Sequence, residues 1–217
     1  MKDNWEWKDY LQLREMRPNL FTPSTLIDIV LDETIVEHYE QETGKRIGVV
    51  YQSAYNTLLV DLIRGKDGQY YTYERIVPTV EKGAVVVVPC CHGKYVLLEQ
   101  FRHAMRQRQI AFPRGYGEAG YSAEENAKKE LLEELAAPVL AITHLGQVVA
   151  DSGLCGNYVD VFLCEISSYS IKHEYEGIVN VVELTEQELR KWIVEGKITD
   201  GYTLSAYGII CSRMNLK

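Results

Sequence analysis

The sequence has no apolar run that approaches the 18 or more residues of a membrane-spanning helix. Its first ten residues, MKDNWEWKDY, lack the basic-then-apolar order of a signal peptide. The five cysteines are odd in number and lack a zinc-like spacing, so we expect reduced thiols that serve mostly in packing. From these absences we expect no membrane partner and a cytoplasmic location.

Positive charge is also scarce. Lys and Arg number 23 against 31 Asp and Glu, which gives a formal net charge of −8. This balance argues against non-specific nucleic-acid binding, and no helix-turn-helix is visible, although a local basic patch can still bind a phosphorylated small molecule. With 217 residues, 46% of them hydrophobic and 25% charged, the chain can bury a core. We expect one compact domain with a small appendage.

Three carboxylates share one face of a predicted helix. In GYGEAGYSAEENAKKELLEELAA, residues 115–137, Glu130, Glu133 and Glu134 stand at i, i+3 and i+4. Like charges at this spacing repel by about 0.2–0.5 kcal/mol per pair on an exposed helix. A solvated acidic face is one interpretation. A bound Mg²⁺ is the other, because hard cations take carboxylate oxygens together with water and phosphates.

The start of this helix favours the cation. Ser122 followed by Glu125 is a capping-box signature, which begins a helix over 122–136 directly after a Gly-rich turn. The turn is thereby held against the acidic face.

The same segment resembles the Nudix box, whose pattern is Gly, five residues, Glu, seven residues, Arg-Glu-apolar-x-Glu-Glu-x-Gly-apolar. The matching residues are Gly115, Glu130, Leu131, Glu133 and Glu134. Three positions depart: Tyr121 stands for the first Glu, Lys129 for the Arg and Ala136 for the closing Gly. Lys keeps the charge and Ala suits a helix end, whereas Tyr121 removes a carboxylate that supports the metal site in the family.

Further motifs resemble the ADP-ribose and nucleotide-sugar pyrophosphatase branch of the Nudix hydrolases. Gln100-Phe101-Arg102 and Pro113-Arg114-Gly115 fill the places that precede the box, and Glu174-Tyr175-Glu176 and the stretch 200–204 resemble the end of that branch. The similarity covers about residues 47–213. It implies an α/β fold, an α/β/α sandwich around a mixed sheet, with a small N-terminal β-rich extension.

We expect three segments. Residues 1–46 form an N-terminal extension without an assigned role, 47–80 a small sheet, and 81–217 the Nudix domain. Apolar runs around the turn at 65–68 predict one hairpin, and two runs within 83–101 predict a strand pair. In the resembled enzymes the small sheet makes a homodimer, which its many tyrosines would suit; an edge sheet packed on the same chain is the alternative. Further elements are predicted as strands at 139–150, 158–166 and 178–183 and helices at 185–195 and 202–213.

The resemblance assigns roles to the acidic residues. Glu130, Glu134 and the backbone carbonyl of Arg114 would bind Mg²⁺ or Mn²⁺, with Glu133 in the same catalytic cluster. The base that activates water lies on a distal loop, where Glu174 or Glu176 can serve. We favour Glu174 as base and Glu176 as a metal contact; a pair of exposed loop acids is the plainer interpretation.

Substrate binding is expected from the cationic stretch before the box. Arg102, Arg106 and Arg114, with His103 and Arg108 nearby, offer donors that match phosphate oxygens, although some of them can simply solvate a loop. Asp151 opens a polar, Gly-rich loop at 151–157 that can move and close over a ligand.

The expected function is divalent-metal-dependent hydrolysis of a nucleoside diphosphate derivative, first of all ADP-ribose to AMP and ribose 5-phosphate. Two alternatives stay open. One is a hydrolase of another nucleotide sugar or a dinucleotide, and the other is a nucleotide-binding module whose changed box no longer cleaves.

Overall fold

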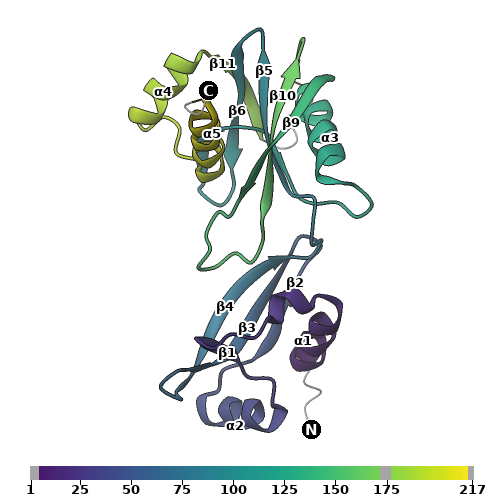
Figure 1. The fold of residues 1–217 in the computed structure, drawn as a ribbon, viewed down its shortest axis with the longest axis vertical. Coiled ribbons are helices and arrows are strands. Elements are labelled where there is room, and N and C mark those ends of the chain that lie inside the picture. The colour runs from purple at the N-terminus through teal and green to yellow at the C-terminus, as the bar shows by residue number, and fades with distance from the viewer. Residues whose placement is uncertain (1–4, 172–176, 215–217) are drawn as a thin grey trace. The chain divides into compact units, whose positions relative to one another are not determined.

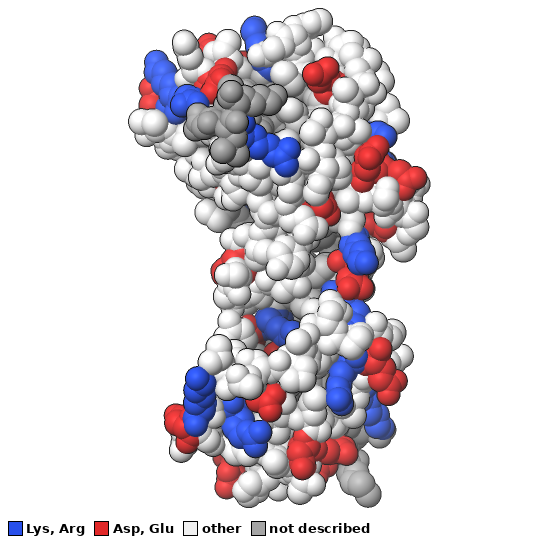
Figure 2. All heavy atoms as spheres, viewed as in Figure 1, with Lys and Arg blue, Asp and Glu red and all other residues white. Residues whose placement is uncertain are grey.

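The computed structural model describes residues 5–171 and 177–214, which divide into two compact units (Figure 1). The first unit runs to Glu81 and also includes Asp151–Asn157. The second unit comprises Lys82–Ala150 and the chain from Tyr158 onward. Charged side chains lie in small groups of mixed sign on the face in Figure 2. Among the described residues, no helix combines the length and the apolar character that crossing a bilayer requires.

The N-terminal unit is built around one antiparallel sheet. Its elements are α1 (Trp5–Met16), the 3-10 helix η1 (Pro18–Phe21), β1 (Ile27–Ile29), α2 (Glu33–Thr43), β2 (Gly48–Gln52), β3 (Asn56–Gly65) and β4 (Tyr70–Pro78). Strand β3 is central and pairs with each of the other three strands. The hairpin expected at 65–68 is confirmed, since the amide of Gly68 donates to the carbonyl of Gly65 at 3.0 Å.

One apolar core joins the helices of this unit to its sheet. Trp7 and Tyr10 of α1 and Val36 of α2 pack in the same buried cluster as Leu59 and Leu62 of β3. A sheet with one apolar face needs a covering layer, and the N-terminal helices supply it. The structure therefore joins the described part of residues 1–46 with residues 47–80, which we expected as separate segments, in one unit.

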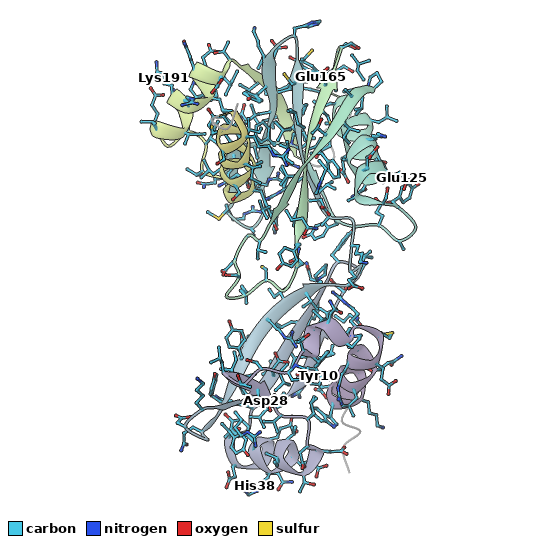
Figure 3. The ribbon with its side chains drawn as sticks, in the orientation of Figure 1. Tyr10, Asp28, His38, Glu125, Glu165 and Lys191 are labelled. Carbon is cyan, nitrogen blue, oxygen red and sulfur yellow. The ribbon has the colours of Figure 1, made fainter. Side chains whose placement is uncertain are left out.

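A buried ionic network lies inside this core. The carboxylate of Asp61 accepts hydrogen bonds from the Tyr10 hydroxyl and from Nε and Nη2 of Arg75, the latter two at 2.6 and 3.1 Å. Arg75 also donates to the carbonyl of Leu20 at 2.7 Å. Burial, with the nearby Asp61 carboxylate, raises the pKa of Tyr10 above its ordinary value. Figure 3 shows Tyr10 within this unit, between α1 and the sheet.

Residues 151–157 are bonded to the edge of β4. The amide of Ile76 donates to the carbonyl of Leu154 and that of Gly156 to the carbonyl of Ile76, both at 2.8 Å. The Tyr73 hydroxyl adds a 2.6 Å hydrogen bond to the carbonyl of Gly153. We expected a loop that can move and close over a ligand. These hydrogen bonds attach it to the sheet, because a strand edge offers unpaired backbone groups.

The second unit is an α/β/α sandwich, as expected. Within the described ranges its seven strands are β5 (Val85–Cys91), β6 (Lys94–Arg102), β7 (Gln107–Ala111), β8 (Arg114–Gly115), β9 (Val139–Val148), β10 (Val159–Ile166) and β11 (Ile178–Leu184). The sheet is mixed, because β5 and β10 are parallel whereas the other pairs are antiparallel. Its helices are α3 (Ala123–Leu135), α4 (Glu186–Val194) and α5 (Gly201–Met214).

The alternating side chains of β5 divide the core of this unit into two layers. Val85 and Val87 pack with Leu131 of α3. Val86 pairs instead with the layer that contains Leu189 of α4 and Ala206 of α5. Helix α3 thus covers one face of the sheet, and α4 and α5 cover the other (Figure 1).

The thiols behave as packing residues. All five cysteines are free, and Cys164 is fully buried beside α3. Burial raises the pKa of the Cys164 thiol from its ordinary value of 9.0 to about 12.

This shift predicts a loss of stability in alkali. Between about pH 9 and pH 12 the unfolded chain gives up the Cys164 proton while the folded chain keeps it, so raising the pH favours unfolding by up to about 1.4 kcal/mol per pH unit. In urea titrations from pH 8 to 10.5, Cys164→Ala should lose stability less steeply than the unsubstituted protein. Parallel curves for the two proteins would contradict the assignment.

Candidate active site

The acidic helix begins and ends with local chemistry that the sequence encodes. At the start of α3, Ser122 Oγ accepts from the amide of Glu125 at 3.2 Å, and the Glu125 carboxylate accepts from the amide of Ser122 at 2.8 Å. The Ser122 hydroxyl also donates to the Glu125 carboxylate at 2.7 Å. This hydrogen bond, followed by the one from the Ser122 amide, lowers the pKa of Glu125, which Figure 3 labels beside α3. At the other end Ala136 has φ +46°, a left-handed conformation that costs an L residue about 1–2 kcal/mol. This conformation favours the Gly of the box pattern, so Ala136 is a costlier departure than we expected.

Glu130 is pressed against the backbone of Gly115. A Cβ atom added at Gly115 would lie 1.9 Å from Glu130 Oε1 and 2.7 Å from its Cγ. Gly115 is held in place because β8 pairs with β5, with Gly115 opposite Val85. The Glu130 carboxylate therefore occupies the space where a side chain at position 115 would lie.

Gly115→Ala should displace this carboxylate. Because the colliding atoms belong to a flexible side chain, we expect the free energy of unfolding to fall by only about 1–3 kcal/mol, while turnover of the substrate proposed below falls at least about 10-fold. Gly208→Ala is the matched control: Gly208 lies within α5 with nothing within 4 Å of an added Cβ, and the change should stabilise by about 0.5–1 kcal/mol. Full turnover by the Gly115→Ala protein would remove Glu130 from the site.

The other two acids of the box differ in environment. Glu134 is 5% exposed. Glu133 is exposed, and its Oε2 lies 3.2 Å from Lys129 Nζ. Over residues 5–171 and 177–214, no three His, Cys, Asp or Glu side chains form a group that could hold a metal ion. Glu174 and Glu176, the predicted base and metal contact, lie outside the described residues.

A buried asparagine that we did not predict braces the Gly-rich turn. Asn126 is fully buried, and its side-chain amide donates to the carbonyls of Gly83 and Tyr116 at 2.8 and 2.7 Å. A polar residue at a core-facing position of a helix is the signal that could have revealed it, since such a group needs internal partners.

The Arg114 side chain has a structural partner. Its Nη1 donates to Asp200 Oδ2 at 3.0 Å, and its guanidinium lies 5.2 Å from the centre of the Tyr202 ring. The other oxygen of Asp200 accepts from the amide and hydroxyl of Thr203 at 2.9 and 2.8 Å, which caps α5. Thr203 Oγ1 in turn accepts from the amide of Phe112 at 3.0 Å. The start of α5 therefore fixes the chain on both sides of Pro113, directly before the box.

The remaining cationic residues lie on the β6–β7 hairpin, which the sequence did not predict. Arg106 pairs with His103 at 2.9 Å and lies 5.1 Å from the centre of the Phe101 ring. Arg108 contacts Glu99 at 3.4 Å, and Arg102 ends β6 in a partly buried position. The amide of Phe101 donates to the carbonyl of Gly177 at 2.8 Å.

Asp151 is placed in the N-terminal unit, where its Oδ1 accepts from the amide of Gly153 at 2.9 Å. The Asp151 side chain therefore stabilises a turn within the loop by bonding the backbone two residues further on.

Comparison with known proteins supports both a family and a fold for this chain. No family model matches the chain. Over 131 residues the chain is 30% identical to a Bacillus subtilis (strain 168) protein named ADP-ribose pyrophosphatase, an alignment that covers 58% of this chain and 70% of that protein. A crystal structure of an ADP compounds hydrolase superposes with a TM-score of 0.67 and 18% identity, covering 77% of this chain and 90% of the other. The second likeness establishes the fold.

Proposed function

The chain belongs to the ADP-ribose pyrophosphatase family of pyrophosphohydrolases, and on that premise we propose that it hydrolyses ADP-ribose to AMP and ribose 5-phosphate. The observation that carries the proposal is the contact between Glu130 and Gly115, in which a carboxylate lies against the backbone of Gly115 with no side chain between them. Carboxylate oxygens are donors that hard cations select.

We propose Glu130, Glu134 and the carbonyl of Arg114 as the residues that would hold Mg²⁺ or Mn²⁺. When bound, the ion would supply positive charge to the pyrophosphate oxygens. Because Asp200 engages the Arg114 guanidinium, Arg114 would contribute through its backbone.

The remaining roles are proposals as well. Arg102 and Arg106 would bind phosphate oxygens through their planar donors, and Asp151 would contact substrate. Glu174 would take the proton of the attacking water, for which it must come within about 2.6–3.2 Å of that water, and Glu176 would assist the metal.

Five exposed or partly exposed tyrosines of the N-terminal unit support a homodimer through its sheet. They are Tyr51, Tyr55, Tyr70, Tyr71 and Tyr73. This dimer and the cytoplasmic location stay predictions.

The function is tested by product analysis. The purified protein is incubated with ADP-ribose, nucleotide sugars and dinucleotides, with Mg²⁺, with Mn²⁺ or with a chelator, and the products are identified by mass spectrometry. Release of AMP and ribose 5-phosphate that stops with the chelator is expected. Preference for another compound would change the substrate. Tight binding without cleavage of any compound would favour the nucleotide-binding module, to which the substitution at Tyr121 points.

A further inference from the structure

The turn between Gly115 and α3 brings two side chains to one place. The amide of Tyr121 donates to the carbonyl of Glu118 at 3.3 Å, and Gly120 has φ +90°. An i to i+3 hydrogen bond with Gly in the left-handed region at the third position describes a tight turn whose first and last α-carbons lie within about 7 Å. The side chains of Glu118 and Tyr121 therefore leave the backbone at points close to each other.

Both ends of this turn meet Lys129 of α3. Lys129 Nζ lies 2.6 Å from Glu118 Oε1 and 5.9 Å from the centre of the Tyr121 ring. The aromatic ring at 121 and the carboxylate at 118 thus contact one cation.

The same cation reaches the acidic face. Its Nζ lies 3.2 Å from Glu133 Oε2, one helical turn further on. A Lys that precedes its Glu by four residues is the less favourable order for a helical ion pair, so this contact alone restrains Lys129 weakly. The shorter contact with Glu118 supplies the second restraint and keeps the ammonium shared between two carboxylates.

The first half of the turn does not depend on Glu118. Asn126 bonds the carbonyl of Tyr116, and a Cβ added at Gly117 would lie 2.0 Å from the carbonyl of Lys82. The second half lies beside Gly83, where an added Cβ would come within 3.6 Å of the Tyr121 carbonyl oxygen, and its side chains at 118 and 121 contact Lys129. Glu118 therefore connects that half to the helix that carries the acidic residues.

Resting on the hydrolase function proposed above, we propose that Glu118, acting through Lys129, is a positioning residue for Glu133 and replaces the carboxylate that the box pattern places at position 121. Without Glu118, the ammonium would settle on Glu133, neutralise it and release the second half of the turn. The Glu118 side chain is 43% exposed, so its ion pair contributes little to the stability of the fold. Loss of this carboxylate should affect the site and leave folding intact.

The test moves the carboxylate from one end of the turn to the other. In Glu118→Gln we expect kcat to fall about 10-fold or more with KM within about twofold, and Mn²⁺ to bind about 10-fold more weakly in an electron paramagnetic resonance titration. Adding Tyr121→Glu to this variant should bring both values back to within about threefold of the starting protein. If Glu118 had only a structural role, a carboxylate at position 121 would not restore kcat or the affinity for Mn²⁺.

The matched control is Glu124→Gln. It breaks a 2.6 Å ion pair with Lys128 on the same helix and should change neither value, and thermal unfolding checks that each variant is folded. A Glu118→Gln protein that binds Mn²⁺ and turns over normally overturns the proposal, as does a folded double variant that stays impaired. If the starting protein cleaves nothing, the hydrolase function fails, while the Mn²⁺ titration still decides the role of Glu118.

Discussion

Glu134→Gln is expected to lower turnover of ADP-ribose by about 10²–10³-fold while the protein stays folded. The substitution keeps the size of a side chain that is 5% exposed but removes its charge. If Glu134 helps to hold the cation, its loss removes several kcal/mol of charge stabilisation from the reaction, and each 1.36 kcal/mol is worth a factor of ten. The measurement is the initial rate of AMP release at a series of Mg²⁺ concentrations.

The comparison for this variant is again Glu124→Gln, which applies the same chemical change to an exposed acid of α3. Its rate and its Mg²⁺ dependence should match those of the starting protein. If Glu134→Gln keeps full activity, the metal assignment is wrong. A lost rate together with a collapsed thermal transition would show that burial, not chemistry, explains Glu134.

Asp61→Asn is expected to destabilise the N-terminal unit by about 3–5 kcal/mol. Asp61 is 2% exposed and the Arg75 side chain 15%, so the substitution leaves a buried guanidinium without its counter-charge. This cost is a large part of the stability of a typical domain. The fluorescence of Trp7, which lies in the same core, would report the change as a lower urea midpoint.

Asp28→Asn is the matched control for Asp61. It breaks an ion pair at 3.4 Å with Arg64 in the same sheet, but both side chains are about half exposed. Exposed pairs contribute about 0–1 kcal/mol, so the urea midpoint should hardly move. Equal shifts for the two variants would mean that the buried network contributes no more than a surface pair.

The acidic helix was predictable almost to the residue because its limits are local chemistry. Ser122 and Glu125 form hydrogen bonds with each other at the start of the helix, and the helix ends at Leu135, three residues before Pro138. Strand β7 was missed because Gln107 and Arg108 read as solvated loop, whereas their pairing with β6 fixes them as a strand. Capping motifs are local and can be recognised in a sequence, whereas the pairing of one strand with another depends on residues outside the segment.

The networks that hold the site and the first core escaped prediction for the same reason. Asp61 meets Tyr10 across 51 positions, and Arg114 meets Asp200 across 86. Each of these residues taken alone resembles an ordinary surface residue, so only the fold shows that they are partners. The motif match identified residues 200–204 as informative but assigned them no role. In the structure, Asp200 and Thr203 hold the chain directly before Gly115 through hydrogen bonds to Arg114 and Phe112.

The N-terminal unit takes residues 151–157 from the middle of the chain, and this has a consequence for synthesis. A ribosome that has finished residue 81 must add about 70 more before that segment exists, which takes about 4–14 s at 5–20 residues per second. Until then the edge of β4 lacks the hydrogen bonds that Leu154 and Gly156 later supply. The first unit is therefore completed only after Lys82–Ala150 of the second unit has been synthesised, and a gene fragment cut after residue 81 encodes the first unit with one edge still open.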